Sequence, residues 1–384
     1  MDFEFTDEQR LLKDSADKLI APAYDDLGHR KKTQALPHGF SEELWAKYAE
    51  LGFLALPFSE DDGGFGAGPV ETMIAMEAIG RGLALEPFFA SIILGGNLIR
   101  LGGTDAQRAD LVPQIADGSL RLAFAHTERQ ARYDLHDVTT HAKRTATGYT
   151  LEGDKSVVVH GDSATKLIVS ARTSGAHRDK KGITLFLVDA KAPGVSRRGF
   201  PTQDGQRGAA ISLAGVEVTD ADVLGTVGEG LGLIAHVTDI AIAALCAEAV
   251  GAMAALHELT LDYAKTRKQF GVTIGSFQVI QHRAVDMFTA LEQARSMEYF
   301  AAMMAEATDP TERAAALSAA KIQINNSARL IGQSAIQIHG GIGITMEYRA
   351  GHYFKRLTMI ESQLGDSDFH MRQLDAAGGL KDAA

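Results

Sequence analysis

The hydrophobic period changes twice along the chain, and this change limits the fold more than any other feature. From Thr6 to about Gly118, apolar residues recur with the spacing of amphipathic helices. Between about Arg121 and Val223 the period becomes two, which is typical of short β-strands divided by turns. After the glycine-rich segment 225–232 the helical period returns and continues almost to the end. This order predicts an α+β protein in which the two helical regions can merge into one body.

We therefore expect domain boundaries near the two changes of period. Thr6, with Glu8 and Gln9 after it, predicts the start of a first helix, and Ser41 before two glutamates predicts another. The middle part is expected to form a small β-barrel or sandwich. The expected domains are 1–120 (N-terminal, helical), 121–225 (middle, β) and 226–384 (C-terminal, helical). The expected strands are 149–152, 155–159, 166–169, 183–188 and 210–213, and the long C-terminal helices lie around 234–267, 276–305 and 309–338.

The charge of the chain disfavours two classes of partner. The 38 Lys and Arg residues against 49 Asp and Glu give a formal charge of −11, which argues against nucleic acid and anionic membrane surfaces. The apolar segment 240–256 carries Glu248, so we expect a buried helix and no membrane span. The single cysteine, Cys246, excludes an intrachain disulfide, and the acidic start of the chain does not look like a targeting signal. We expect a cytoplasmic protein.

Two glycine-containing segments have groups suited to an anion. The segment 265–271 places Arg267 near a helix end, where a guanidinium suits a phosphate or pyrophosphate. Its cations would equally well balance the negative end of the helix dipole. The segment 337–345 contains glycines whose backbone amides can approach an anion closely, although such glycines also simply end helices. No strand precedes it, so a Rossmann-type interpretation fails.

The segment 124–128 is a third candidate, since a strand here is followed by hydroxyl and backbone amide groups in a row. The alternative is a turn capped by Thr127. The 13 histidines show no metal-binding spacing, so no metal site is expected. A Gly-x-Ser-x-Gly motif is absent from the sequence, which gives no support to a serine hydrolase.

The order and spacing of these segments resemble the acyl-CoA dehydrogenase family of flavoenzymes over nearly the whole chain. The resemblance is carried by 267–271 with 277–278, by 337–341 with 347–348, and by Thr127-Glu128. It implies an N-terminal helical domain, a middle β domain and a C-terminal four-helix domain, assembled as a tetramer built from dimers. FAD would lie between the middle and C-terminal domains, and the neighbouring subunit would complete the site.

The resemblance also implies a reaction and a set of residues that would contact FAD. An acyl-CoA thioester would lose a proton from its α carbon and a hydride from its β carbon, giving a trans-2-enoyl-CoA. The electron acceptor is usually an electron-transfer flavoprotein. The implied FAD contacts are Phe124, His126, Thr127, Val157 and Val159 from the middle domain, Arg267, Gln269, Phe270 and Gln278 across the subunit contact, and Gln337, Gly340 and Gly341 from the second motif.

The sequence departs from the family where the base that takes the α-proton should be. The usual carboxylate position aligns with Leu364 and the family's alternative position with Ala241, and neither residue can accept a proton. Three carboxylates lie near these positions. Glu248 is on the same helix as Ala241, but a carboxylate there also suits an ion pair with a neighbouring helix or subunit. Asp366 and Asp368 follow Leu364, but aspartates are also typical of a helix start.

A narrower resemblance points to a small group within the family. The segments 61–66, 125–134 and 352–359 resemble the small subunits of pimeloyl-CoA dehydrogenases. A family serine near flavin and substrate appears here as Tyr133, and a family aromatic near the flavin appears as Val157, so substrate access is expected to differ.

The sequence has the FAD motifs that the resemblance implies, but it has no carboxylate at either expected base position. Three hypotheses follow from this combination. The chain is an FAD-dependent subunit of a homo- or hetero-tetramer, in which a large partner subunit supplies the catalytic Glu. Alternatively, it is a self-sufficient flavoenzyme with a relocated carboxylate. The third hypothesis is a non-catalytic subunit that only assembles its partner.

Overall fold

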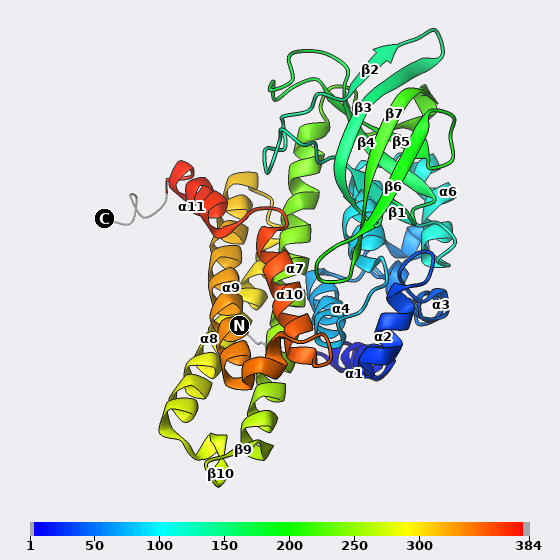
Figure 1. Cartoon of the computed structure of the whole chain (residues 1–384). Coiled ribbons are helices and arrows are strands. Elements are labelled where there is room, and N and C mark those ends of the chain that lie inside the picture. The colour runs from blue at the N-terminus through cyan, green and yellow to red at the C-terminus, as the bar shows by residue number, and fades with distance from the viewer. Residues whose placement is uncertain (1–3, 379–384) are drawn as a thin grey trace. The chain divides into compact units, whose positions relative to one another are not determined.

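The computed structural model describes residues 4–378 (Figure 1). The chain divides into two compact units. Among the described residues, unit 1 comprises 4–32, 69–84 and 242–378, and unit 2 comprises 33–68 and 85–241. The predicted order of helices, then strands, then helices is confirmed. The passage from unit 2 back to unit 1 occurs inside one continuous helix, α7 (Gly230–Thr266), whose first turns belong to unit 2.

An eight-stranded sheet forms the centre of unit 2. Its main path runs β6-β7-β3-β2-β4-β5-β8, and β1 pairs with β4 in parallel. Among the described strands, β6 and β8 are not paired with each other, so the path has two ends. The strands are β1 (Leu122–Ala125), β2 (His141–Arg144), β3 (Gly148–Val159), β4 (Lys166–Arg172), β5 (Ile183–Asp189), β6 (Val195–Pro201), β7 (Arg207–Thr219) and β8 (Val223–Leu224).

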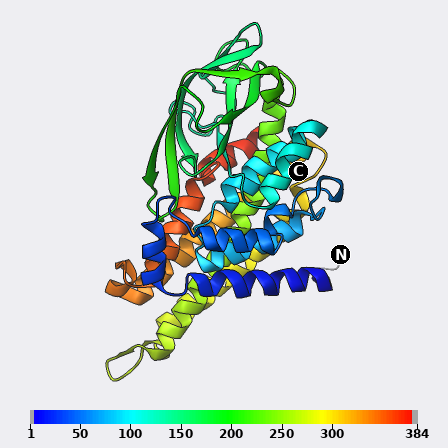
Figure 2. The ribbon, with the colours of Figure 1, turned by 90° about the vertical axis from the view of Figure 1, so that its right-hand side faces the viewer.

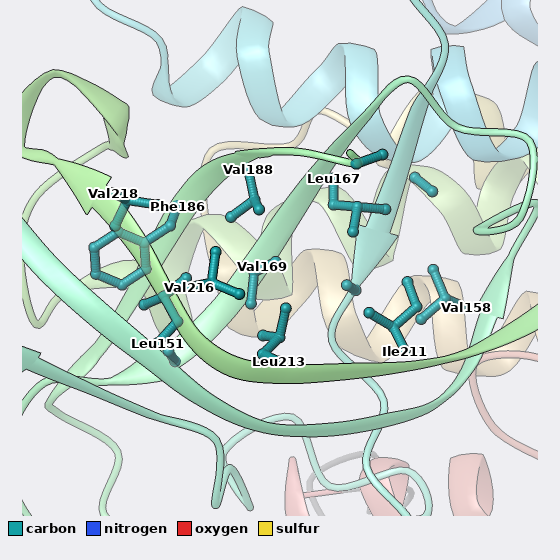
Figure 3. Packing of buried hydrophobic residues seen from close by; sticks show 14 of the residues in the cluster. Leu151, Val158, Leu167, Val169, Phe186, Val188, Ile211, Leu213, Val216 and Val218 are labelled. Carbon is teal, nitrogen blue, oxygen red and sulfur yellow. The ribbon is translucent and has the colours of Figure 1, made fainter. Parts of the chain in front are cut away.

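The sheet curves around an apolar core, which Figure 3 shows from close by. Alternate residues of the two longest strands point into it, among them Leu151 and Val158 of β3 and Ile211 and Leu213 of β7. Phe186 of β5 completes the core and packs edge-on against Tyr149. This packing fixes which face of each strand is left for other contacts.

One strand differs from its prediction. The segments 149–152 and 155–159 were expected as separate strands, divided at Gly153-Asp154. They form one strand, β3, because register shifts against β7 at 151/152 and between 155 and 158 let the ladder continue.

Helices also belong to unit 2. Ser41 caps α3 (Glu42–Glu50) by accepting from the backbone N–H of Leu44, as predicted. The one tryptophan, Trp45, is buried and donates to the carbonyl of Gly118. The other helical elements are η1 (Phe53–Ala55), η2 (Glu60–Asp62), η3 (Phe89–Gly96), α5 (Asn97–Gly102), α6 (Asp105–Ala116) and η4 (Asp220–Asp222).

Unit 1 is a set of helices arranged around α9 (Pro310–His339). Three helices pack against α9: α8 (Gln278–Met304), α10 (Arg349–Ser362) and α11 (Ser367–Ala376). Thr6 caps α1 with a complete capping box to Gln9, which confirms the predicted helix start. The remaining elements with residues in unit 1 are α1 (Asp7–Ala23), α2 (Leu27–Gln34), α4 (Pro69–Gly82), β9 (Lys268–Gln269), β10 (Val272–Thr273), η5 (Ile274–Ser276) and η6 (Gly340–Ile344).

Helices α4 and α7 approach each other at two glycines. A Cβ at Gly80 would lie 1.9 Å from the carbonyl oxygen of Glu248, and a Cβ at Gly251 would lie 2.0 Å from that of Glu77. Any side chain at either position would therefore force the two backbones apart.

Helix α7 is the one described helix that is long and apolar enough to cross a membrane by length and composition alone. Of its most apolar stretch, 89% is buried inside the protein, which is the pattern of a core helix. The C-terminal half of α7 and the N-terminal half of α8 run side by side and carry the β9-β10 hairpin at their tip (Figures 1 and 2).

Candidate active site

In unit 2, the predicted flavin-contacting residues lie on β1 and β3, whose ends are joined by hydrogen bonds. The rings of Phe124 and His126 are stacked, with centroids 5.2 Å apart and planes inclined by 8°. The backbone N–H of Ser156 donates to the carbonyl of Thr127 over 2.9 Å. Val157 follows on β3 and is 49% exposed, which is unusual for an apolar side chain in a strand beside a buried core.

A buried ion pair between Lys155 and Glu128 holds β1 and β3 in this arrangement. The Lys155 ammonium donates to Glu128 over 2.7 Å, to the Ser170 hydroxyl over 3.1 Å and to the carbonyl of His126 over 3.3 Å. The Glu128 carboxylate also accepts from the backbone N–H groups of Thr139 and Thr140 over 2.8 and 3.0 Å. One carboxylate therefore joins β1, β3 and the segment before β2.

The network changes the proton affinity of each member. Burial alone would raise the pKa of the Glu128 carboxyl. The Lys155 ammonium and the hydrogen bonds outweigh burial and hold this pKa well below its ordinary 4.5. Burial lowers the pKa of Lys155 from 10.5 to about 8, against the opposing effect of Glu128. Burial, with the nearby Lys155 charge, lowers the pKa of His126 from 6.5 to about 3. His126 is consequently a neutral hydrogen-bonding partner of Ser170, 2.9 Å away, at neutral pH.

Sequence reasoning did not identify Lys155 or Ser170 as parts of this site. Lys155 had a weak signal, because it is the one lysine or arginine in β3 and directly precedes Ser156 and three valines. Ser170 had none, since a serine within a buried strand is common and its partners come from distant parts of the sequence.

In unit 1, the first predicted motif lies at the tip formed by α7 and α8. Helix α7 ends at Thr266, and Arg267, Gln269 and Gln278 after it are exposed. Phe270 is 93% exposed, has a φ of 55° and contacts Phe277 edge-on at 6.2 Å. A non-glycine residue with positive φ is uncommon, and the exposed ring of Phe270 is accessible for the contact that the resemblance implies.

The second motif follows α9. A Cβ at Gly340 or Gly341 would meet no atom within 4 Å, so the backbone faces open space there. The preceding His339 is buried and donates from Nδ1 to the carbonyl of Ala335 over 2.8 Å, which anchors the start of the loop. Gln337 lies one turn earlier on α9 and is exposed.

The two positions where a family base is expected carry no proton acceptor. Leu364 lies in the turn between α10 and α11 and has a φ of 57°, a left-handed conformation that is unfavourable for leucine. Gly365 follows it, and His370 lies against the turn, 2.5 Å from where a Cβ of Gly365 would stand. Ala241 is completely buried in α7.

Glu248 is engaged in a buried ion pair. Its two carboxylate oxygens accept from Nε and Nη2 of Arg356 over 2.6 and 2.7 Å, and both residues are buried. This is the bidentate geometry that guanidinium and carboxylate groups prefer. This geometry indicates that Glu248 forms a structural ion pair and favours that role over the role of a catalytic base.

The two aspartates after Leu364 lie at the start of α11. Asp366 is the N-cap residue and accepts from the backbone N–H of Phe369 over 2.8 Å, and Asp368 lies in the first turn. This geometry favours the helix-start alternative for both.

The residues of each unit fit FAD by their chemistry. Unit 2 offers the stacked Phe124 and His126 and the exposed Val157, which suit a flat, largely apolar ring. Unit 1 offers the exposed Arg267 and the open backbone at Gly340 and Gly341, which suit a pyrophosphate.

Comparisons with known proteins agree across the whole chain. Three family models match: acyl-CoA dehydrogenase N-terminal domain over residues 6–119, middle domain over 123–220 and C-terminal domain over 228–378. The probable acyl-CoA dehydrogenase YngJ of Bacillus subtilis (strain 168) is 32% identical over 378 residues, which cover 96% of this chain and 97% of the relative.

Two solved structures are similar over nearly their full length. The FAD complex of PigA has a TM-score of 0.90 and 27% identity, covering 99% of this chain and 100% of that one. A variant of the Tcur3481-Tcur3483 steroid ACAD has a TM-score of 0.86 and 27% identity, covering 98% and 99%. The chain therefore belongs to the acyl-CoA dehydrogenase family, FAD-dependent oxidoreductases that act on the CH–CH bond of acyl-CoA thioesters.

Proposed function

We propose that this chain is an FAD-binding subunit of a heteromeric acyl-CoA dehydrogenase, in which a partner subunit supplies the base that takes the α-proton. The observation that carries the proposal is that Leu364 and Ala241, with which the resemblance aligns the family's two base positions, have no group that accepts a proton.

The nearby carboxylates support the same conclusion by what they contact. A base must be able to reach the substrate α-proton and hold it. Both oxygens of Glu248 face the Arg356 guanidinium in a buried pair, and Asp366 caps a helix. To act as bases, Glu248 would have to leave a buried cation unpaired and Asp366 would have to give up its cap.

In the proposed reaction, FAD held by these residues would supply the acceptor for the hydride that leaves the substrate β carbon. The chain's own residues would bind and orient. Phe124, His126 and Val157 would hold the ring against unit 2, and His126 would be uncharged at neutral pH because burial lowers its pKa to about 3. Arg267 would pair with the pyrophosphate of FAD in a neighbouring subunit.

The narrower assignment concerns the substrate and the partners. The resemblance of segments 61–66, 125–134 and 352–359 to the pimeloyl-CoA dehydrogenase small subunit favours a dicarboxylic or similarly large acyl group. The similar steroid ACAD carries a name that joins two proteins, which supports a two-chain assembly in this part of the family. We propose a hetero-tetramer with a large subunit, located in the cytoplasm, that passes electrons to an electron-transfer flavoprotein.

Anaerobic titration tests the proposal. The chain is purified alone, its visible spectrum is recorded with FAD bound, and pimeloyl-CoA is added without oxygen. The proposal predicts a flavin band that remains unbleached. Rapid bleaching by the chain alone would support a self-sufficient enzyme and overturn the need for a partner base, whereas failure to bind FAD under any condition would favour the purely assembling role.

A further inference from the structure

A hollow of about 590 Å³ lies on unit 2. Its lining includes Lys155, Ser156 and Thr139 of the network that joins β1 and β3, but no role described above fills its open space. Its lining comes from strands β3, β6 and β7, which are neighbours in the sheet, and from Arg129, Gln130 and Thr139. Figure 1 labels the three strands. All of the residues that line the hollow belong to unit 2. Its volume lies within the range of small-molecule sites.

The floor is hollowed because its side chains are small. In the sheet register, Ser212 of β7 lies between Ser196 of β6 and Asp154 of β3, and Ala210 lies beside Arg198. Side chains alternate along a strand, so these residues share the face opposite the apolar core. Short serine and alanine side chains on adjacent strands leave space that larger residues would fill.

Two guanidinium groups at the hollow have no partner of their own. Arg129 and Arg198 are exposed, and the guanidinium of neither has a hydrogen bond or an ion pair within residues 4–378. The neighbouring Arg197 differs, because it donates to three backbone carbonyls and is used in the fold. Lys155 beneath is paired with Glu128.

The charge balance of the hollow is therefore positive. Two unpaired guanidiniums face one carboxylate, that of Asp154, while the chain as a whole is acidic. The hydroxyls of Ser196 and Ser212 add hydrogen-bonding groups on the floor. A positive hollow on an acidic protein concentrates small anions.

We infer that this hollow binds a small molecule that carries a carboxylate or a phosphate next to an apolar part. The guanidiniums of Arg129 and Arg198 hold the oxyanion, the serine hydroxyls donate to it, and Ala210 contacts the apolar remainder. Guanidinium groups recognise both kinds of oxyanion by paired hydrogen bonds. This site is separate from the proposed flavin contacts and does not depend on a partner base.

Calorimetric titration of the full chain with FAD bound tests the inference. The probes are pimelate, inorganic phosphate and coenzyme A, at constant ionic strength. Pimelate supplies carboxylates on an apolar chain, whereas coenzyme A supplies phosphates. Binding of pimelate that coenzyme A does not displace identifies the carboxylate as the ligand group, and displacement by coenzyme A identifies the phosphate.

Two kinds of variant locate the binding. Arg129→Gln and Arg198→Gln each remove one guanidinium, and we expect each to weaken binding about 10-fold, as for other charged hydrogen bonds. Lys143→Gln is the matched control, since Lys143 is an exposed cation on β2 whose ammonium forms no ion pair within residues 4–378 and which does not line the hollow. Ala210→Leu fills the floor without changing charge and should also weaken binding about 10-fold.

The results separate this inference from the proposed function. Loss of affinity in both arginine variants and in Ala210→Leu, with Lys143→Gln unchanged, supports the hollow as a site. The inference is overturned if Lys143→Gln weakens binding as much as the two arginine variants do. It is also overturned if Ala210→Leu has no effect on binding, or if no probe binds saturably. Retained FAD absorbance and an unchanged melting temperature show that a variant is folded, and flavin bleaching is not part of the readout.

Discussion

Glu248 and Arg356 share two hydrogen bonds inside unit 1, and this pair distinguishes a structural carboxylate from a catalytic base. We predict that Glu248→Gln lowers the free energy of unfolding by about 3–5 kcal/mol, because it leaves a buried guanidinium without a counter-charge. Urea unfolding followed by circular dichroism measures this loss.

The double variant Glu248→Gln with Arg356→Met provides the matched control for that prediction. It removes both charges, so it should recover much of the lost stability. A stable Glu248→Gln protein that has lost only flavin reduction by substrate would contradict the structural role.

Leu364 lies in a left-handed turn, and the resemblance aligns the base of the family with it. We predict that Leu364→Glu allows acyl-CoA to bleach the flavin of this chain, because it places a carboxylate where relatives are expected to have one. Leu364→Gln is the control, since it has the same shape and no basic oxygen. Equal behaviour of the two variants in anaerobic titration would show that the missing carboxylate is not what limits the chain.

Single residues were predicted from the sequence where the cause is local. Thr6 and Ser41 cap helices as expected, because capping depends on the next three residues. Both alternatives for Glu248 were left open, since its partner Arg356 is 108 residues away along the chain. Lys155 was missed for the same reason: its role depends on Glu128 and Ser170, which lie on other elements.

At the scale of elements, the crossing of α4 and α7 depends on two glycines. We predict that Gly251→Ala destabilises unit 1 by about 1–3 kcal/mol or more, because the added Cβ would lie 2.0 Å from the carbonyl oxygen of Glu77. Gly232→Ala on the same helix is the control. A Cβ there meets nothing within 4 Å, so stability should be unchanged or slightly raised. Thermal melting distinguishes the two, and equal melting temperatures would refute close packing at the crossing.

The hydrogen-bonded link between β1 and β3 predicts that the stability of unit 2 depends on pH. The pKa of His126 is lowered in the folded chain, from 6.5 to about 3, so the unfolded chain binds a proton that the folded chain does not. Stability should therefore fall as pH drops below about 6.5. The lowered pKa of Glu128 adds to the loss below its ordinary value of 4.5.

The buried Trp45 reports on unit 2 in this experiment, because it is the only tryptophan of the chain. Urea midpoints from its fluorescence are compared between pH 6.5 and pH 4.5. His126→Asn, which has no titrating ring, should show a smaller decrease than the original chain. An identical decrease in both would mean that His126 does not carry the dependence.

Strand prediction failed at one informative place. Gly153-Asp154 has the composition of a turn, and yet β3 continues through it. The continuation depends on the long partner β7 and on register shifts in the pairing, which are tertiary features that a local pattern does not contain.

At the scale of the whole molecule, the two changes of hydrophobic period were sufficient to predict the order of helical, β and helical parts. The division of the chain into units 1 and 2 could not be predicted from the hydrophobic period. Residues 69–84 lie early in the sequence but belong to unit 1 with residues 242–378, because α4 packs against α7 through glycines whose role only the structure reveals. Sequence motifs likewise identified exposed FAD-binding candidates, but not the buried network that supports them.

The central claim is that this chain has no base of its own for the substrate α-proton, and deuterium exchange tests it most directly. The FAD-bound chain is incubated alone with pimeloyl-CoA in D₂O without oxygen, and the recovered thioester is analysed by mass spectrometry. The account predicts no deuterium at the α carbon above an enzyme-free sample, and exchange in the Leu364→Glu variant. Rapid exchange by the unaltered chain would contradict the account, because it would show that a residue of this chain already removes the α-proton.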